Sequence, residues 1–170
     1  VHDDLDDITQ QHIFNFWNPK GGLFYTINEN NSAYFSVAYS NREPNRDIYT
    51  DADELQRERI THEKLIDYEL GYSFINRKTN LNANFFYMDY KDQLVLTGEI
   101  NNVGNAIMTN VDNSYRFGLE ASAAFLFNRY FALDFNFAIS QNKILNFIDF
   151  VDEYDADWNY LGQKETNLGT

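Results

Sequence analysis

The stretch from Asn113 to Asn146 constrains the fold more than any other, because it alternates apolar and polar residues over two long runs. Side chains of a β-strand point to opposite faces with a period of two. One run extends from Tyr115 to Phe127 and the other from Phe131 to Ile139, with Asn128-Arg129-Tyr130 between them. The pattern predicts two strands joined by a tight turn, each with one apolar face.

Two features of this hairpin favour a membrane-spanning pair of strands. The apolar rows run for about 12 residues, roughly twice the usual strand length. The face opposite the apolar one carries Ser, Asn, Ala, Gly and single charges. Such strands are typical of transmembrane β-barrels, whose apolar face meets lipid while the other lines the lumen. A soluble β-sandwich produces the same alternation on shorter strands and stays an alternative.

The whole chain reads as about six antiparallel strands. Ahead of the hairpin, strands are predicted over Gln11–Ile27 (with an irregular first half), Ser32–Arg42, Lys64–Asn76 and Asn80–Glu99. Three short turns, 29–31, 77–79 and 128–130, alternate with three long polar segments, 43–63, 100–112 and 147–170. Outer-membrane barrels have short periplasmic turns and long extracellular loops, so this alternation favours a barrel. Six strands would leave edges unpaired in lipid, and we therefore expect further strands beyond this chain.

Composition narrows the class of protein. A chain of 170 residues is long enough for one domain, and its 17% aromatic content is foreign to disordered chains. It has no cysteine, which excludes disulfides and thiolate metal sites. The net charge of −13 argues against a nucleic-acid partner. There is no run of 18 apolar residues and no signal peptide, and the chain starts and stops in polar stretches, so we expect a piece of a longer protein.

Five segments resemble the C-terminal half of the barrel of TonB-dependent outer-membrane receptors. They are N-P-K-G-G-L-F-Y (18–25), A-Y-F-S-V-A-Y-S-N-R-E-P (33–44), E-K-L-I-D-Y-E-L-G-Y (63–72), N-A-N-F-F-Y-M-D-Y-K-D-Q-L-V (82–95) and S-Y-R-F-G-L-E (114–120). The resemblance covers nearly the whole chain. The sequence of these segments is similar to that of receptors of the iron-compound type from Bacteroidetes.

The resemblance implies that residues 1–170 are part of a 22-stranded barrel whose N-terminal plug and periplasmic TonB box lie outside this chain. It implies a location in the outer membrane of a Gram-negative bacterium and active import of a scarce ligand, with an iron-siderophore or another metal chelate expected. The expected partners are the TonB complex, through the N-terminal part, the ligand and outer-membrane lipid. A passive porin-like channel is the rival within the same fold class.

Two sets of residues are candidates for function. The first is a row of charges predicted to face the lumen, where they would form a polar network that holds a plug or lines a wet interior. Its members are Asp67, Glu69, Arg116, Glu120 and Asp134. The second set lies in the predicted outer loops and consists of possible ligand contacts. Its members are Arg42, Arg46, Tyr49, Trp158 and Tyr160.

We find no sequence signature of a metal site, a cofactor site or an enzyme. Asp155-x-Asp157-x-Asn159 begins like a calcium-binding loop, but Tyr160 replaces the glycine of the sixth position and Thr166 the glutamate of the twelfth. The three histidines lack ligand spacing. Nucleophilic triads and phosphate-binding glycine loops are also missing from the sequence.

Overall fold

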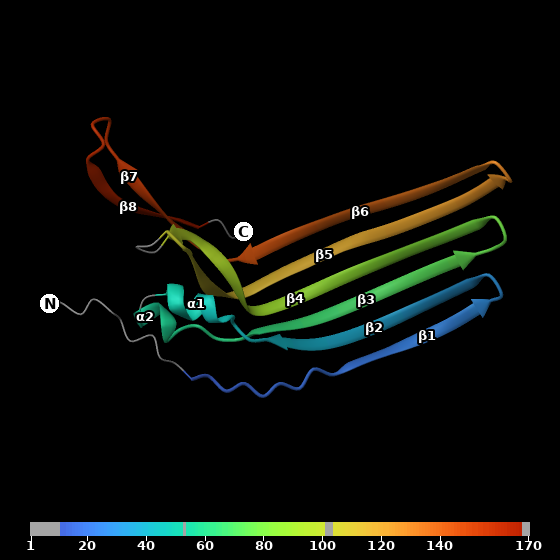
Figure 1. The fold of residues 1–170 in the computed structure, drawn as a ribbon, viewed down its shortest axis with the longest axis horizontal. Helices are drawn as coiled ribbons and strands as arrows, with labels where there is room; N and C mark the ends of the chain where they lie inside the picture. The colour runs from blue at the N-terminus through green and yellow to red at the C-terminus, as the bar shows by residue number, and fades with distance from the viewer. Residues whose placement is uncertain (1–10, 53, 101–103, 168–170) are drawn as a thin grey trace.

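The main body of the molecule is one antiparallel sheet whose six strands follow one another in chain order (Figure 1). The structure is a computed structural model that describes residues 11–52, 54–100 and 104–167. The strands are β1 (Lys20–Asn28), β2 (Asn31–Arg42), β3 (Glu63–Ile75), β4 (Thr79–Ile100), β5 (Ala106–Asn128) and β6 (Phe131–Leu145). The six predicted strands are thus confirmed, except that residues 11–19 lie outside β1.

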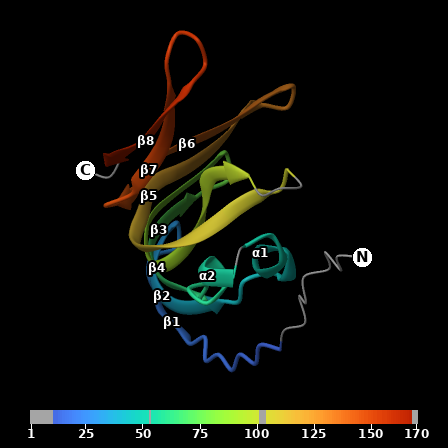
Figure 2. The ribbon, with the colours of Figure 1, turned by 90° about the vertical axis from the view of Figure 1, so that its left-hand side faces the viewer.

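The sheet is strongly curved, and its two faces differ in composition. Figure 2 shows the curvature, with the helices on the concave side. Register places Leu119 opposite Ile139 and Ala121 opposite Phe137 on one face, and Glu120 opposite Ala138 on the other. Phe135, Phe137 and Leu119 on the convex face are 56%, 45% and 38% exposed. A soluble sandwich would bury this face against a second sheet, whereas the described residues contain only the two-stranded sheet of a separate hairpin beside this one.

The concave face holds two aromatic rings flat against neighbouring glycines. Tyr34 and Gly71 are cross-strand partners, as are Phe86 and Gly118. A Cβ added at Gly71 would lie 1.9 Å from Cε1 of Tyr34, and one at Gly118 would lie 2.7 Å from Cζ of Phe86. Only glycine permits such an approach, and the rings therefore lie low on the sheet surface.

One end of the sheet, here called the turn end, carries the three short connections 28–31, 76–79 and 128–131. Each begins with an asparagine: Asn28, Asn76 and Asn128. Each Oδ1 accepts a hydrogen bond from the backbone N–H two residues on, at 3.0, 2.8 and 2.9 Å respectively. This Asx turn lets a short polar side chain replace backbone pairing within the connection.

The opposite end, the loop end, is more ordered than its polar sequence predicts. Segment 43–63, predicted to be a plain connection, contains α1 (Arg46–Asp51) and α2 (Glu54–Arg57). The Asn45 side chain caps α1 by accepting from the Ile48 N–H at 3.0 Å. Segment 100–112, predicted to be a loop, already belongs to β5 from Ala106 onward. β4 and β5 thus extend beyond the sheet as a two-stranded arm toward α1 (Figure 2).

The loop end also contains most of the buried apolar side chains of the described residues. They are Ile48, Tyr49 and Ala52 from the α1 region and Leu94 and Val111 from the arm. The arm and the helix are joined directly where Asn105 Nδ2 donates to Asp51 Oδ1 at 2.8 Å. The loop end therefore has a small core of its own, which we call the loop-end cluster.

The prediction of a loop over residues 147–170 is wrong for most of this segment. The segment forms a separate antiparallel hairpin of β7 (Ile148–Tyr154) and β8 (Tyr160–Asn167), which projects from the loop end in Figure 1. Among the described residues, none of the helices has the length and apolar character needed to cross a membrane.

Candidate functional site

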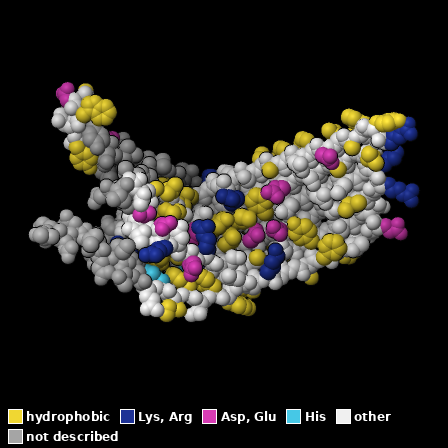
Figure 3. All heavy atoms as spheres, viewed as in Figure 1, with side chains coloured by type: hydrophobic (Ala, Val, Ile, Leu, Met, Phe, Trp, Pro, Cys, Tyr) yellow, Lys and Arg dark blue, Asp and Glu magenta, His cyan; other side chains and the backbone are white. Residues whose placement is uncertain are grey.

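The five charged residues predicted to face the lumen do share the concave face. Asp67 and Glu69 on β3 pair with Met88 and Phe86 on β4. Met88 in turn pairs with Arg116 on β5, so all of these residues lie on the same face of the sheet. The same parity holds for Glu120, which pairs with Asn84, and for Asp134, which pairs with Ala124. Figure 3 looks at this face and shows acidic and basic side chains gathered over the middle of the sheet.

These charges do not pair with one another in the described part of the chain. Glu69 Oε2 accepts from Ser36 Oγ at 3.0 Å, and Arg116 Nε donates to Asn142 Oδ1 at 2.6 Å. The Oδ1 atom of Asp67 is buried without a hydrogen-bond partner. β4 separates the acids of β3 from Arg116, so the cross-strand charge pairs considered for this row do not form. Glu69 and Arg116 are thus each hydrogen-bonded to a neutral polar group, and none of the five charges is ion-paired within the described residues.

Two hollows mark the polar face, each with a volume of ≈ 470 Å³. One lies between β4, β5 and β6, where Asn84, Glu120 and Asn136 contribute to its wall. The other lies nearer the loop end and includes Arg116 and Asn142. The amides and single charges offer hydrogen bonds in both directions, and apolar side chains such as Phe137 and Ile144 complete the lining.

A buried glutamate that sequence reasoning missed ties three strands together at the loop end. Glu63, the first residue of β3, is 6% exposed. Its Oε2 lies 2.5 Å from Arg42 Nε of β2, and its Oε1 accepts from the Leu94 N–H of β4 at 2.7 Å. Arg42, predicted as a ligand contact, is thus held in place by an ion pair while its side chain stays 71% exposed.

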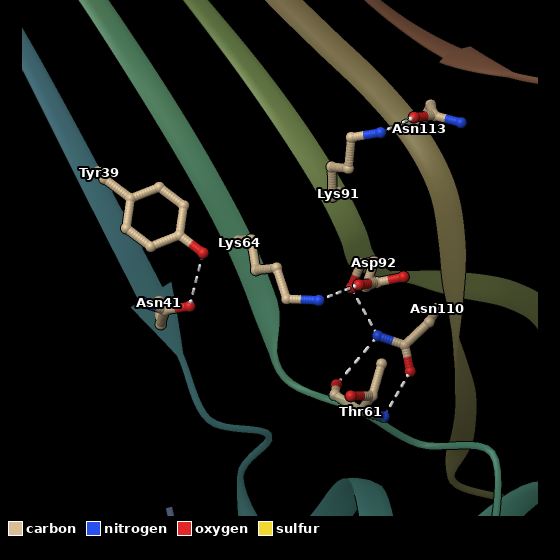
Figure 4. A network of polar contacts seen from close by, with 8 residues as sticks. All are labelled: Tyr39, Asn41, Thr61, Lys64, Lys91, Asp92, Asn110 and Asn113. Atoms are coloured by element: carbon tan, nitrogen blue, oxygen red, sulfur yellow. Dashed lines mark hydrogen bonds and ion pairs between the residues drawn. The ribbon is translucent and has the colours of Figure 1, made fainter. Parts of the chain in front are cut away.

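Beside Glu63, Asn110 joins the arm to the segment that enters β3, as Figure 4 shows. Its Oδ1 accepts from Thr61 N–H at 2.9 Å, and its Nδ2 donates to Thr61 O at 3.0 Å and to Asp92 O at 2.5 Å. Asp92 has a φ of 56°, where β4 departs from regular strand geometry, and its carboxylate binds Lys64 Nζ at 2.8 Å. No local sequence pattern predicts the role of this asparagine, because its hydrogen-bond partners lie far away in the sequence.

The other predicted ligand contacts in the helical segment differ in accessibility. Arg46, at the start of α1, is exposed. Tyr49 is 6% exposed, and its ring stacks on His12 with centroids 4.1 Å apart. Near it, Phe16 lies 5.0 Å from the ring of His62. Tyr49 therefore packs within the loop end instead of facing solvent.

Trp158, in the connection between β7 and β8, and Tyr160, the first residue of β8, are well exposed, at 82% and 59%. Asp155 organises this turn: its Oδ1 accepts from the N–H groups of Asp157 and Asn159 at 2.9 and 2.8 Å, and its Oδ2 from Asn159 Nδ2 at 2.9 Å. These hydrogen bonds, chiefly those from Asn159, lower the pKa of Asp155. Residues 155–159, whose sequence begins like a calcium-binding loop, therefore form an Asx turn beside two exposed aromatic side chains.

The described residues contain no group of three or more His, Cys, Asp or Glu side chains able to hold a metal ion.

Long antiparallel strands with an exposed apolar convex face and a polar concave face define a segment of the wall of a transmembrane β-barrel. The chain belongs to the family described as TonB dependent receptor-like, beta-barrel, whose model matches residues 2–168. A comparison with curated proteins gives no match.

Solved structures with the same fold include three transport proteins. The siderophore receptor PirA from Pseudomonas aeruginosa has a TM-score of 0.64 and 18% identity over 75% of this chain and 25% of its own. The FrpB iron transporter from Neisseria meningitidis (F3-3 variant) has a TM-score of 0.56 and 18% identity over 75% and 20%. The copper transporter OprC has a TM-score of 0.65 and 15% identity over 74% and 20%. The chain thus spans about a quarter or less of each structure's length.

Proposed function

We propose that this chain is part of the wall of an outer-membrane receptor that imports a scarce ligand with energy from the TonB complex. The observation that carries the proposal is the opposition of the two faces of the sheet. Water penalises exposed apolar area by about 25 cal/mol per Å², and contact with lipid removes this cost from the convex face. Contiguous apolar surface of this kind marks a membrane or protein contact.

The dimensions of the apolar face support a lipid contact. The outward residues of β6 are apolar from Phe131 to Ile139, and a tilted transmembrane strand needs about 9–11 residues. A row of tyrosines follows at the loop-side border, where Tyr87 lies 6.4 Å from Tyr68 and 6.1 Å from Tyr115, measured between ring centroids. Aromatic rings of this kind form the girdles of outer-membrane barrels.

The concave face is proposed to line the lumen of a 22-stranded barrel and to contact a plug domain. Its five charged residues and its two hollows present hydrogen-bonding groups, and Gly71 and Gly118 keep its aromatic rings low. A plug would then meet a smooth polar wall and not a hydrophobic one. The TonB complex would act through a part of the receptor outside this chain.

The ligand is proposed to be an iron-siderophore or another metal chelate, captured at the loop end. The names of the three similar structures, a siderophore receptor, an iron transporter and a copper transporter, support this class of ligand. Arg42, Arg46, Trp158 and Tyr160 are the accessible candidates for contact. Guanidinium groups suit the carboxylate and phenolate oxygens of chelators. The proposal assigns no catalytic step to this chain.

The test uses the full-length receptor in its native host. Membrane fractionation should recover it in the outer membrane, and its deletion should abolish growth on one of a panel of ferric siderophores supplied as sole iron source. Recovery as a soluble protein would sink the membrane assignment. Uptake that survives loss of TonB would favour the passive channel, and unimpaired growth of the deletion strain on every iron source would remove the ligand class.

A further inference from the structure

The three connections of the turn end form one continuous strip. Backbone hydrogen bonds run between neighbours: Ile75 N–H donates to Asn30 O at 2.8 Å, and Leu126 N–H donates to Lys78 O at 2.7 Å. Each turn is therefore fixed against the next strand pair. Their side chains stand side by side at one border of the convex face.

This strip is basic in a protein that is otherwise acidic. Arg77, Lys78 and Arg129 are three of the four charged residues of the turns, the fourth being Glu29, while the chain carries a net charge of −13. Basic side chains also stand out at the turn end in Figure 3. All three are exposed.

The turn-end bases differ from the other basic residues in their partners. Arg42 and Lys64 form ion pairs with acids, and Arg116 binds an amide. Within the described ranges the structure gives Arg77, Lys78 and Arg129 no ion pair with an acid. Arg129 instead lies over the ring of Tyr130, 4.4 Å from its centroid. Cations left without carboxylate partners are available to an external anion.

Apolar side chains continue up to these bases. Phe127 and Phe131 are 55% and 56% exposed, and their rings lie 5.3 Å apart. Tyr130, which supports Arg129, is 80% exposed. An apolar surface that ends in tyrosine and unpaired cations matches a bilayer, whose hydrocarbon ends in phosphate. A periplasmic acidic protein would match the charges but leave the rings unexplained.

We propose that the turn end binds the headgroups of anionic phospholipids, with their phosphates contacted by Arg77, Lys78 and Arg129. The inference rests on the proposed function, because it takes the convex face to meet lipid. Arginine suits the role, since its planar guanidinium binds phosphate through two parallel N–H groups. Each basic side chain is expected to contribute about fivefold to the preference for an anionic lipid.

The test measures lipid retention by the full-length receptor. The receptor is incorporated into vesicles of equal amounts of phosphatidylglycerol and phosphatidylcholine, extracted in mild detergent, and its retained lipids are quantified by mass spectrometry. Wild type should retain phosphatidylglycerol preferentially. The double variant Arg77→Gln/Arg129→Gln should reduce that preference at least tenfold, and Arg77→Lys/Arg129→Lys should keep most of it.

The matched control removes two exposed basic residues away from the turn end, Lys20→Gln/Arg59→Gln, and should retain the wild-type preference. Equal retention of the two lipids by wild type overturns the inference, as does an unchanged preference in Arg77→Gln/Arg129→Gln or an equal loss in the control. Membrane fractionation of the same cells separates the two proposals. A receptor found in the outer membrane without lipid preference refutes this inference alone, whereas a soluble receptor refutes the proposed function.

Discussion

The turn end and the loop end close the same sheet with hydrogen bonds of very different range. In the turns, asparagine side chains bind backbone groups two or three residues away. At the loop end, Asn110 binds Thr61 across 49 residues, Glu63 binds Leu94 across 31, and Asn105 binds Asp51 across 54. Each turn is therefore closed by its own residues, with single hydrogen bonds such as Asn30 Nδ2 to Ile75 O joining it to its neighbour, whereas the loop end is a tertiary structure assembled from three segments.

This difference suits the proposed roles of the two ends. A turn that is closed by its own residues forms whenever those few residues meet, and hydrogen bonds to the neighbouring strand then hold it in place. A tertiary cluster can be opened at one contact and then release more than one segment together. Ligand capture benefits from such a cooperative unit, while the lipid border benefits from turns that stay closed. The effects of substitutions at the two ends should therefore differ in their size and in how far from the substituted residue they are seen.

The largest effect is expected from Glu63→Ala. The substitution leaves the Leu94 N–H buried without an acceptor and removes the ion pair of Arg42. We expect the free energy of local opening at the Leu94 amide, measured by hydrogen exchange on the folded receptor, to fall by about 2–3 kcal/mol. Glu63→Gln keeps an acceptor for the N–H and should cost less. The control is Glu58→Ala, which removes an exposed acid of the same connection. An equal effect of Glu58→Ala would contradict the claim that the hydrogen bond of Glu63 stabilises the Leu94 amide.

A smaller but more far-reaching effect is expected from Asn110→Ala. The change removes hydrogen bonds to both backbone groups of Thr61 and to Asp92 O, so the arm and the 43–62 segment should open together. We expect a loss of about 1–2 kcal/mol, seen as faster exchange in both segments. Thr109→Ala, at an exposed neighbouring position of β5, serves as the control. Faster exchange confined to the arm would disprove the coupling.

The turn end should respond less, and only locally. Asn128→Ala removes the acceptor of the Tyr130 and Phe131 N–H groups, a loss comparable to that of a helix N-cap, about 1 kcal/mol. Exchange should accelerate at those two amides and remain unchanged at the loop end. Asn128→Asp keeps the acceptor and should behave like wild type. Faster exchange of the arm amides in Asn128→Ala would contradict the proposed difference between the two ends.

The same distinction explains which features were predictable from the sequence. Strands β2 to β6, the three turns and the assignment of Glu120 and Asp134 to the polar face follow from alternation and from turn residues, which are local signals. α1 has only 6 residues, too few to show a helical period. The hairpin of β7 and β8 was missed because acids interrupt its apolar positions. The roles of Glu63 and Asn110 depend on distant partners, and the positive φ of Asp92 follows from no pattern in the sequence.

The smallest effect concerns the turn that presents Trp158, which is a local structure placed at the loop end. Because its hydrogen bonds lower the folded pKa of Asp155 below the ordinary value of 3.8, the ionised form stabilises the turn. That contribution is complete above the ordinary value and is lost as the pH falls through the lowered one. Hydrogen exchange at the Asn159 amide, corrected for intrinsic rate, should therefore accelerate only under strongly acidic conditions. Asp155→Asn retains an acceptor that does not titrate, so its corrected rate should be independent of pH across this range. Pronounced acceleration in wild type already between pH 7 and the ordinary carboxyl value would contradict the assignment to Asp155. A change in the Leu94 amide when Asp155→Asn is compared with wild type at neutral pH would show that this turn is part of the loop-end cluster.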